Sequence, residues 1–223
     1  FDGRFGLWNM VQPGDAALLL QDFGREFVLL ETGLKKYPVC ACSHAAMEST
    51  AALVDAWALQ PGDIDSIEVV ISPFMHRLVG TPFDPGANIE VTAQFSIQYA
   101  IACMVLWRRL GIAELQAAQV LDPRIRALVE RVRVTIDPAN TGGLAPATVH
   151  LRTRDGRSAT HTTQEMPGSP AAPMSGEAIE TKLRACARAG LRVMDDREVD
   201  RLREAVAHVD AMADVAELAE LLA

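Results

Sequence analysis

The chain has 223 residues, of which 49% are hydrophobic and 22% are charged. This composition is typical of a globular protein with a core and excludes the fibrous and disordered classes. With 21 basic and 29 acidic residues the net charge is −8, and this sign argues against a nucleic-acid partner or an anionic membrane surface.

The first strongly predicted element is a helix over residues 44–59. Pro38 disfavours helix upstream of it, and Ser43 is of the residue type that caps helix N-termini. Apolar residues recur at helical spacing within the segment. Pro61-Gly62 is the expected stop.

Two strands and the helices around them form the middle of the chain. Residues 67–71 and 132–136 alternate apolar and polar side chains, as half-buried strands do. Between them, residues 89–110 are apolar nearly all round, so we expect one long buried helix there. Asp122 and Pro123 supply an N-cap and a first-turn proline for a short helix reaching about residue 130.

A hairpin and two further helices are predicted in the last third. The runs 147–152 and 158–164 flank Asp155-Gly156, a strong hairpin signal. After a Pro-rich linker, helices are expected at 176–189 and 197–222. This order of elements predicts an α+β domain with a four-stranded, mostly antiparallel sheet packed with helices.

Residues 35–44 are dense in ionisable side chains of several kinds. The segment holds two amines, a phenol, two thiols and an imidazole, and contains no Asp or Glu: Lys35-Lys36-Tyr37-Pro38-Val39-Cys40-Ala41-Cys42-Ser43-His44. A connection between two elements rarely needs such a set, so the segment is predicted to be part of a site.

The residue types suggest a role for three of these side chains. Lys35 can pair with a carboxylate as a point charge, although a solvated surface lysine is the alternative. His44, close to a positive helix N-terminus, is expected to stay neutral and act as a base or hydrogen-bond donor, unless it only bonds backbone. The same helix end favours the thiolate of Cys40, which then serves as an acid, a base or a polar wall. Lys36 points to the other side of an extended segment and is expected to be solvated.

The segment resembles the central motif of the MmgE/PrpD family, with Lys35-x-Tyr37-Pro38-x-Cys40 followed by His44 and an Ala-rich helix. Further matches follow in the same order: Asp63-Ile64, His76-Arg77-Leu78-Val79-Gly80, Ala93 to Ala100, Asp122, and Gly168-Ser169-Pro170 before Lys182. The family includes 2-methylcitrate dehydratase, cis-aconitate decarboxylase and iminodisuccinate epimerase. The resemblance covers most of the chain.

The resemblance implies a domain organisation. Family members carry a large all-helical domain before this region and return to it at the end of the chain, so this chain resembles a C-terminal portion. We expect residues 1–34 to close the helical domain, 35–168 to form the α+β domain, and 169–223 to be a linker with returning helices. The implied partners are that helical domain, or a separate helical chain, and a second copy in a homodimer.

The resemblance also bears on His76, Arg77 and Tyr37. The family position that matches His76 is an aromatic or imidazole side chain implicated in the active site, so His76 is expected to move or bind protons. Arg77, which follows it, is a candidate carboxylate clamp. A loop histidine and a surface arginine are the alternatives. Tyr37 is expected at the site as a substrate-binding or supporting phenol.

The expected activity is that of a lyase, either a dehydratase or a decarboxylase, acting without cofactor on a small di- or tricarboxylate. Such reactions build charge on a carbon beside a carboxylate, and they require cations, a base and an acid. An epimerase of the same family is the alternative, toward which the segment 73–80 leans. The family's remaining acid–base residues lie in its helical domain, so the chain alone is expected to be inactive.

Two alternative functions belong to other classes of protein. One is a non-catalytic subunit that pairs with a separate helical chain. The other is a metal-binding module through Cys40, Cys42 and His44, but the spacing is not that of a zinc knuckle and no second cysteine pair completes it, so no metal is predicted.

No apolar run reaches transmembrane length and no signal peptide is recognisable, so a cytoplasmic location with reduced thiols is expected.

Overall fold

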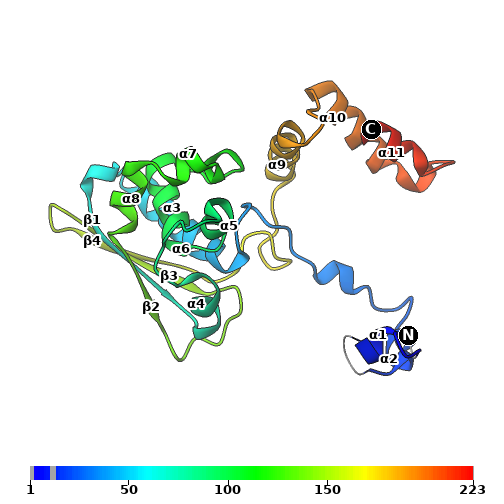
Figure 1. The fold of residues 1–223 in the computed structure, drawn as a ribbon, viewed down its shortest axis with the longest axis horizontal. Coiled ribbons are helices and arrows are strands. Elements are labelled where there is room, and N and C mark those ends of the chain that lie inside the picture. Colours follow the sequence, from blue (N-terminus) through cyan, green and yellow to red (C-terminus); the bar gives the residue numbers. More distant parts are fainter. Residues whose placement is uncertain (1–2, 11–13, 223) are drawn as a thin grey trace. The chain divides into compact units, whose positions relative to one another are not determined.

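The computed structural model describes residues 3–10 and 14–222, and the chain divides into two compact units, Phe1–Gly33 and Leu34–Ala223. The first unit contains the short helices α1 (Leu7–Met10) and α2 (Ala16–Leu20) and a 3-10 turn, Val28–Glu31. Several of its large apolar side chains are exposed, including Phe23 and Leu29. The second unit (Figure 1) contains the sheet and all the predicted site residues.

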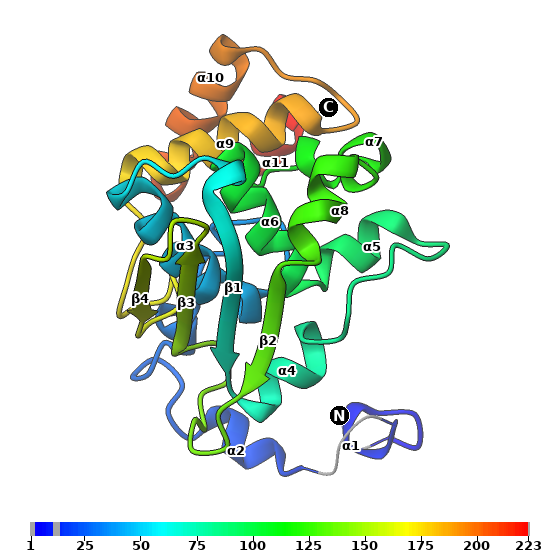
Figure 2. The ribbon, with the colours of Figure 1, turned by 90° about the vertical axis from the view of Figure 1, so that its left-hand side faces the viewer.

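A four-stranded mixed sheet organises the second unit. Its strands are β1 (Ile64–Ile71), β2 (Val132–Ile136), β3 (Ala147–Thr153) and β4 (Ser158–Thr163), in the order β2-β1-β3-β4 (Figure 2). Strands β1 and β2 are parallel, whereas β3 is antiparallel to both β1 and β4. The predicted α+β class, the mostly antiparallel sheet and the hairpin are therefore confirmed.

Helices cover the apolar face of this sheet. Helix α3 (His44–Ala56) packs on β3 and β4, and α6 (Ile97–Trp107) lies between α3, α8 (Pro123–Val129) and β2. Figure 2 shows α3 and α6 behind the strands. The inward side chains of the two central strands are fully buried because alternate residues of a strand point to the same face; they are Ile67, Val69, Ile71, Val149 and Leu151.

The prediction of one long helix over residues 89–110 is wrong. The segment forms two helices, α5 (Ile89–Gln94) and α6. Ser96 is extended, with φ −111° and ψ 114°, and its hydroxyl accepts a hydrogen bond from the Tyr99 amide. Ser96 thus caps α6 and ends the helical run, although the hydrophobic pattern continues across it.

The C-terminal region also differs from its prediction. Helix α9 (Gly176–Ala189) forms as expected, but residues 197–222 divide into α10 (Asp196–Ala207), a 3-10 turn and α11 (Ala216–Leu222). The side chain of Asp214 accepts a hydrogen bond from the Ala216 amide and starts a new helix there.

Two short helices in the middle of the chain were not predicted, α4 (Pro73–Val79) and α7 (Ala117–Val120).

Candidate functional site

The site is built on the turn that leads into α3. Residues Ala41–Ser43 form a 3-10 turn that continues directly into the helix, and Cys40 is the extended residue before it, with φ −58° and ψ 131°. The prediction that Ser43 caps α3 is wrong, because Ser43 is already helical and its side chain makes no cap bond. The positive end of the helical run therefore lies at Cys40.

His44, on the first turn of α3, is fully buried. Neither ring nitrogen has a hydrogen-bond partner among the described residues, and the buried hydroxyl of Ser43 has none either. Buried polar groups are nearly always paired, so an unpaired imidazole beside an unpaired hydroxyl is typical of a functional site. The backbone of Val39 and Tyr37 nevertheless acts on the imidazole and raises its pKa, so the alternative of a histidine bonded to backbone stays open.

Burial lowers the pKa of His44 to about 4. The backbone of Val39 and Tyr37 partly offsets this effect, and the positive charge of Lys35 adds to it. The imidazole is therefore neutral near pH 7, with one nitrogen free to accept a proton and the other to donate a hydrogen bond.

Two thiols lie beside this imidazole in the same turn. The Cys42 thiol is buried and has two acceptors within reach, the carbonyl oxygen of Gly143 at 3.4 Å and the sulfur of Cys40. Turned toward Cys40, it lowers the Cys40 pKa to about 6, with help from the Lys35 charge, although burial opposes the shift. The pKa of Cys42 itself is raised by the same bond and by burial.

Lys35 is exposed at the edge of this cluster. Its ammonium is near enough to act on the pKa values of Cys40, Cys42 and His44. The preceding residue is held in place, because the Leu34 amide donates a 2.8 Å hydrogen bond to the Gly168 carbonyl. The structure thus brings together Lys35, Cys40 and His44, and the role of Lys35 toward a carboxylate stays a prediction.

His76 and Arg77 lie on α4, a helix that packs against the Ala41–Ser43 turn. His76 is half-buried, and its ring lies so close to Gly80 that a Cβ added there would be 2.5 Å from His76 Cδ2. Arg77 is exposed, with its guanidinium carbon 5.8 Å from the centre of the Phe74 ring. His76 is therefore a helical residue, on an element that contacts the turn, and Arg77 faces outward.

The loop around Gly142 and Gly143 belongs to the site, and sequence reasoning missed it. The Gly142 carbonyl accepts a 2.6 Å hydrogen bond from Ser72, the buried residue that caps α4, and the Gly143 carbonyl accepts from Cys42. A Cβ on Gly142 would lie 1.6 Å from the Ala145 oxygen, so only glycine fits there. The adjacent glycines after Asn140 were the available signal.

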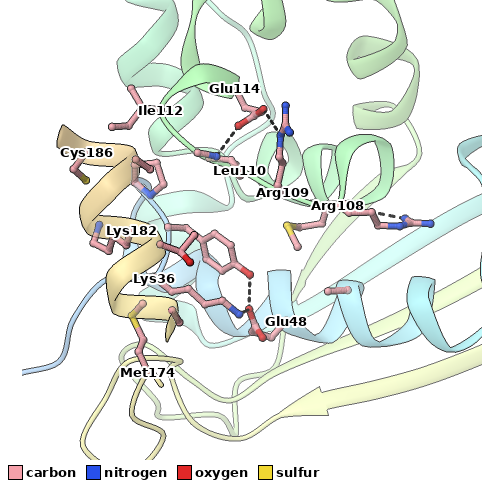
Figure 3. A pocket seen from close by; sticks show the side chains of 18 of the residues that line it. Lys36, Glu48, Arg108, Arg109, Leu110, Ile112, Glu114, Met174, Lys182 and Cys186 are labelled. Atoms are coloured by element: carbon pink, nitrogen blue, oxygen red, sulfur yellow. Dashed lines mark hydrogen bonds and ion pairs between the residues drawn. The ribbon is translucent and has the colours of Figure 1, made fainter. Parts of the chain in front are cut away.

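A cavity of about 770 Å³ lies on the side of the segment that Lys36 and Tyr37 face. In Figure 3 the Lys36 side chain points to Glu48, and its ammonium lies 2.6 Å from a carboxylate oxygen. The same oxygen accepts a hydrogen bond from the Tyr37 hydroxyl. Lys36 is therefore half-buried and paired, not the solvated residue predicted. Burial and Glu48 raise the pKa of Tyr37, which keeps its proton. Lys182 and Cys186 of α9 line the opposite wall.

No three His, Cys, Asp or Glu side chains in residues 3–10 and 14–222 gather as a group able to hold a metal ion. Over the same ranges, no helix combines the length and apolar character needed to span a bilayer.

The fold and site define an α+β domain that holds a neutral, buried imidazole and a lysine among thiols at a helix start. The sequence model of the MmgE/PrpD C-terminal domain matches residues 37–211, and the chain belongs to the MmgE/PrpD family. This family includes enzymes, dehydratases among them. No curated protein matches the chain in sequence.

Proposed function

We propose that this chain is the α+β portion of a cofactor-independent lyase that dehydrates or decarboxylates a small di- or tricarboxylate. The observation that carries the proposal is His44, which is fully buried, has no partner for either ring nitrogen among the described residues, and lies within reach of the Lys35 charge. A buried neutral imidazole beside a cation suits proton transfer at a carbon next to a carboxylate.

In the proposed reaction, the Lys35 ammonium binds a substrate carboxylate and stabilises the charge that develops on the neighbouring carbon. In a dehydration, the free nitrogen of His44 takes the proton from that carbon and a second group protonates the leaving hydroxyl, which departs as water. In a decarboxylation, the bond to the carboxylate breaks, carbon dioxide leaves, and an acid delivers one proton to the carbon that keeps the electron pair. Cys40 and His76 are the candidates for this acid, because Cys40 precedes the turn and His76 is on α4, the helix that packs against it.

The experiment follows proton exchange and uses the polypeptide as its source makes it, with its intact mass measured first. Incubation with candidate polycarboxylates in deuterated water is expected to place deuterium on the carbon beside a carboxylate and to form an unsaturated or decarboxylated product. Lys35→Met and His44→Gln should each slow exchange by about 100-fold or more, as removal of a positioned acid–base group does. Arg133→Met, which removes an exposed cation from β2, is the matched control.

Two results would contradict the proposed lyase activity. Deuterium uptake with inversion and without product would instead support an epimerase of the same family. Unchanged activity of the assembly containing Lys35→Met and His44→Gln would favour a non-catalytic subunit. A helical domain or helical partner chain completing the site, and a homodimer, are parts of the proposal that the intact mass and the oligomeric state test.

A further inference from the structure

The Cys40–Cys42 pair forms a thiol couple with unequal members. Cys40 is half-buried at the start of the helical run, whereas Cys42 is 1% exposed. Only Ala41 separates them, and Cys40 immediately precedes the 3-10 turn that contains Cys42. An oxidant from solvent therefore meets Cys40 first, with a second thiol already placed behind it.

The surroundings of Cys40 favour its reaction with oxidants. Thiolates are the reactive form, and a helix N-terminus and a nearby ammonium stabilise them. Cys40 has both, since Lys35 acts on it from one side and Ala41–Ser43 and α3 begin immediately after it. The other cysteines lack this setting: Cys103 is fully buried in α6, where its pKa is raised, and Cys186 is exposed on α9.

We infer that Cys40 is a peroxide-reactive cysteine and that Cys42 resolves it into an intrachain Cys40–Cys42 disulfide. The Cys40 sulfur attacks one oxygen of hydrogen peroxide, the O–O bond breaks, and the released hydroxide leaves as water, giving a sulfenic acid. The Cys42 sulfur then attacks the Cys40 sulfur, the S–O bond breaks, and the hydroxyl departs with the Cys42 proton as a second water. Two thiols are oxidised and one peroxide is reduced.

The disulfide is expected to be reversible. A bridge between residues separated by one position closes a very short loop, and strained disulfides are more easily reduced than structural ones. Its formation also removes the hydrogen bond from Cys42 to the Gly143 carbonyl. Oxidation thus changes the contact between the turn and the Gly142–Gly143 loop, next to His44.

The test treats the reduced chain with stoichiometric hydrogen peroxide, alkylates all remaining thiols after denaturation, and maps them by peptide mass. We expect Cys40 and Cys42 to escape alkylation together and to recover after treatment with a dithiol reductant. Alkylation of both after peroxide would overturn the proposal, and so would a disulfide found only between chains through Cys186. This readout needs no turnover, so its failure is distinct from failure of the proposed lyase activity.

Cysteine variants distinguish the role of Cys40, which reacts with peroxide, from the role of Cys42, which forms the disulfide with it. In Cys42→Ser, or in Cys42→Ala if the serine variant does not fold, the sulfenic acid on Cys40 should persist and be captured by dimedone. In Cys40→Ser, Cys42 should remain reduced under the same treatment. Cys186→Ser is the control and should form the Cys40–Cys42 bridge as the unmodified chain does. Dimedone capture on Cys42 instead of Cys40 would overturn the assignment.

Discussion

The rings of Tyr37 and His44 pack edge to face, with centroids 5.3 Å apart and an angle of 84° between their planes. The Tyr37 hydroxyl is held by Glu48, which Lys36 also binds. This bond fixes the phenol ring against the imidazole, and the ring helps to exclude water from it. Tyr37 therefore supports the environment of His44 through packing.

We predict that Tyr37→Ala raises the pKa of His44 from about 4 toward its ordinary value, because water then reaches the imidazole. Tyr37→Phe keeps the ring and should leave this pKa near 4, while the lost hydroxyl bond costs about 1 kcal/mol of stability. NMR titration of the His44 ring signals in the two variants tests this. Equal pKa values in both would contradict the packing role.

Acid should destabilise the fold through His44. The folded state binds this proton only near pH 4, whereas the unfolded chain binds it near 6.5. The unfolded state therefore holds more protons between these values, and stability present above pH 6.5 is lost as the pH falls to 4, by about 3 kcal/mol. Urea unfolding across this range should show the loss. In His44→Gln this part of the pH dependence should disappear, and its persistence would assign the loss to other groups.

The Cys40 thiol should react with iodoacetamide with a midpoint near pH 6, because the bond from Cys42 and the Lys35 charge lower its pKa. A Cys186→Ser background leaves Cys40 as the accessible thiol among buried ones. Lys35→Met should move the midpoint upward, and Cys42→Ala should move it further, since the hydrogen bond is the larger cause. A midpoint near 9 in the unmodified sequence would contradict the prediction.

Gly168→Ala should destabilise the second unit strongly. Gly168 has φ +91°, and an added Cβ would lie 1.9 Å from the Leu34 oxygen. Gly156 has nearly the same conformation, φ +90°, with nothing within 4 Å of the added Cβ. Gly156→Ala should therefore cost about 1–2 kcal/mol, from backbone strain alone, and Gly168→Ala about 2–5 kcal/mol, because the clash adds to it. Urea unfolding of both variants measures the difference, and equal losses would exclude the clash.

Gly80→Ala should disturb His76, since the new Cβ would lie 2.5 Å from the imidazole Cδ2 and 2.8 Å from the His76 carbonyl oxygen. We expect a loss of about 1–3 kcal/mol from overpacking. Part of it should be recovered in the double variant with His76→Ala, where the ring is gone but the carbonyl remains. A double-mutant cycle by urea unfolding measures this coupling. Strict additivity would show that the ring is not the obstacle.

The sequence by itself determined the strands and the hairpin. The alternation in β1 and β2 follows from the two-residue period of a strand, and Asp155-Gly156 marks the turn between β3 and β4 because glycine takes its φ of +90° without strain. The ordered motif beginning at Lys35 likewise predicted the family, which the match over residues 37–211 confirms. These signals are local, so one stretch of chain carries each of them completely.

Only the tertiary structure decided the state of the site. A neutral His44 was predicted from the helix N-terminus, but burial is the first cause of its low pKa, and no pattern around residue 44 encodes that burial. The bonds from Ser72 to Gly142 and from Cys42 to Gly143 join residues 70 and 101 positions apart. Hydrophobic period and residue type describe the neighbours along the chain. Desolvation, pKa and hydrogen-bond partners depend on the neighbours in space, and packing alone selects those.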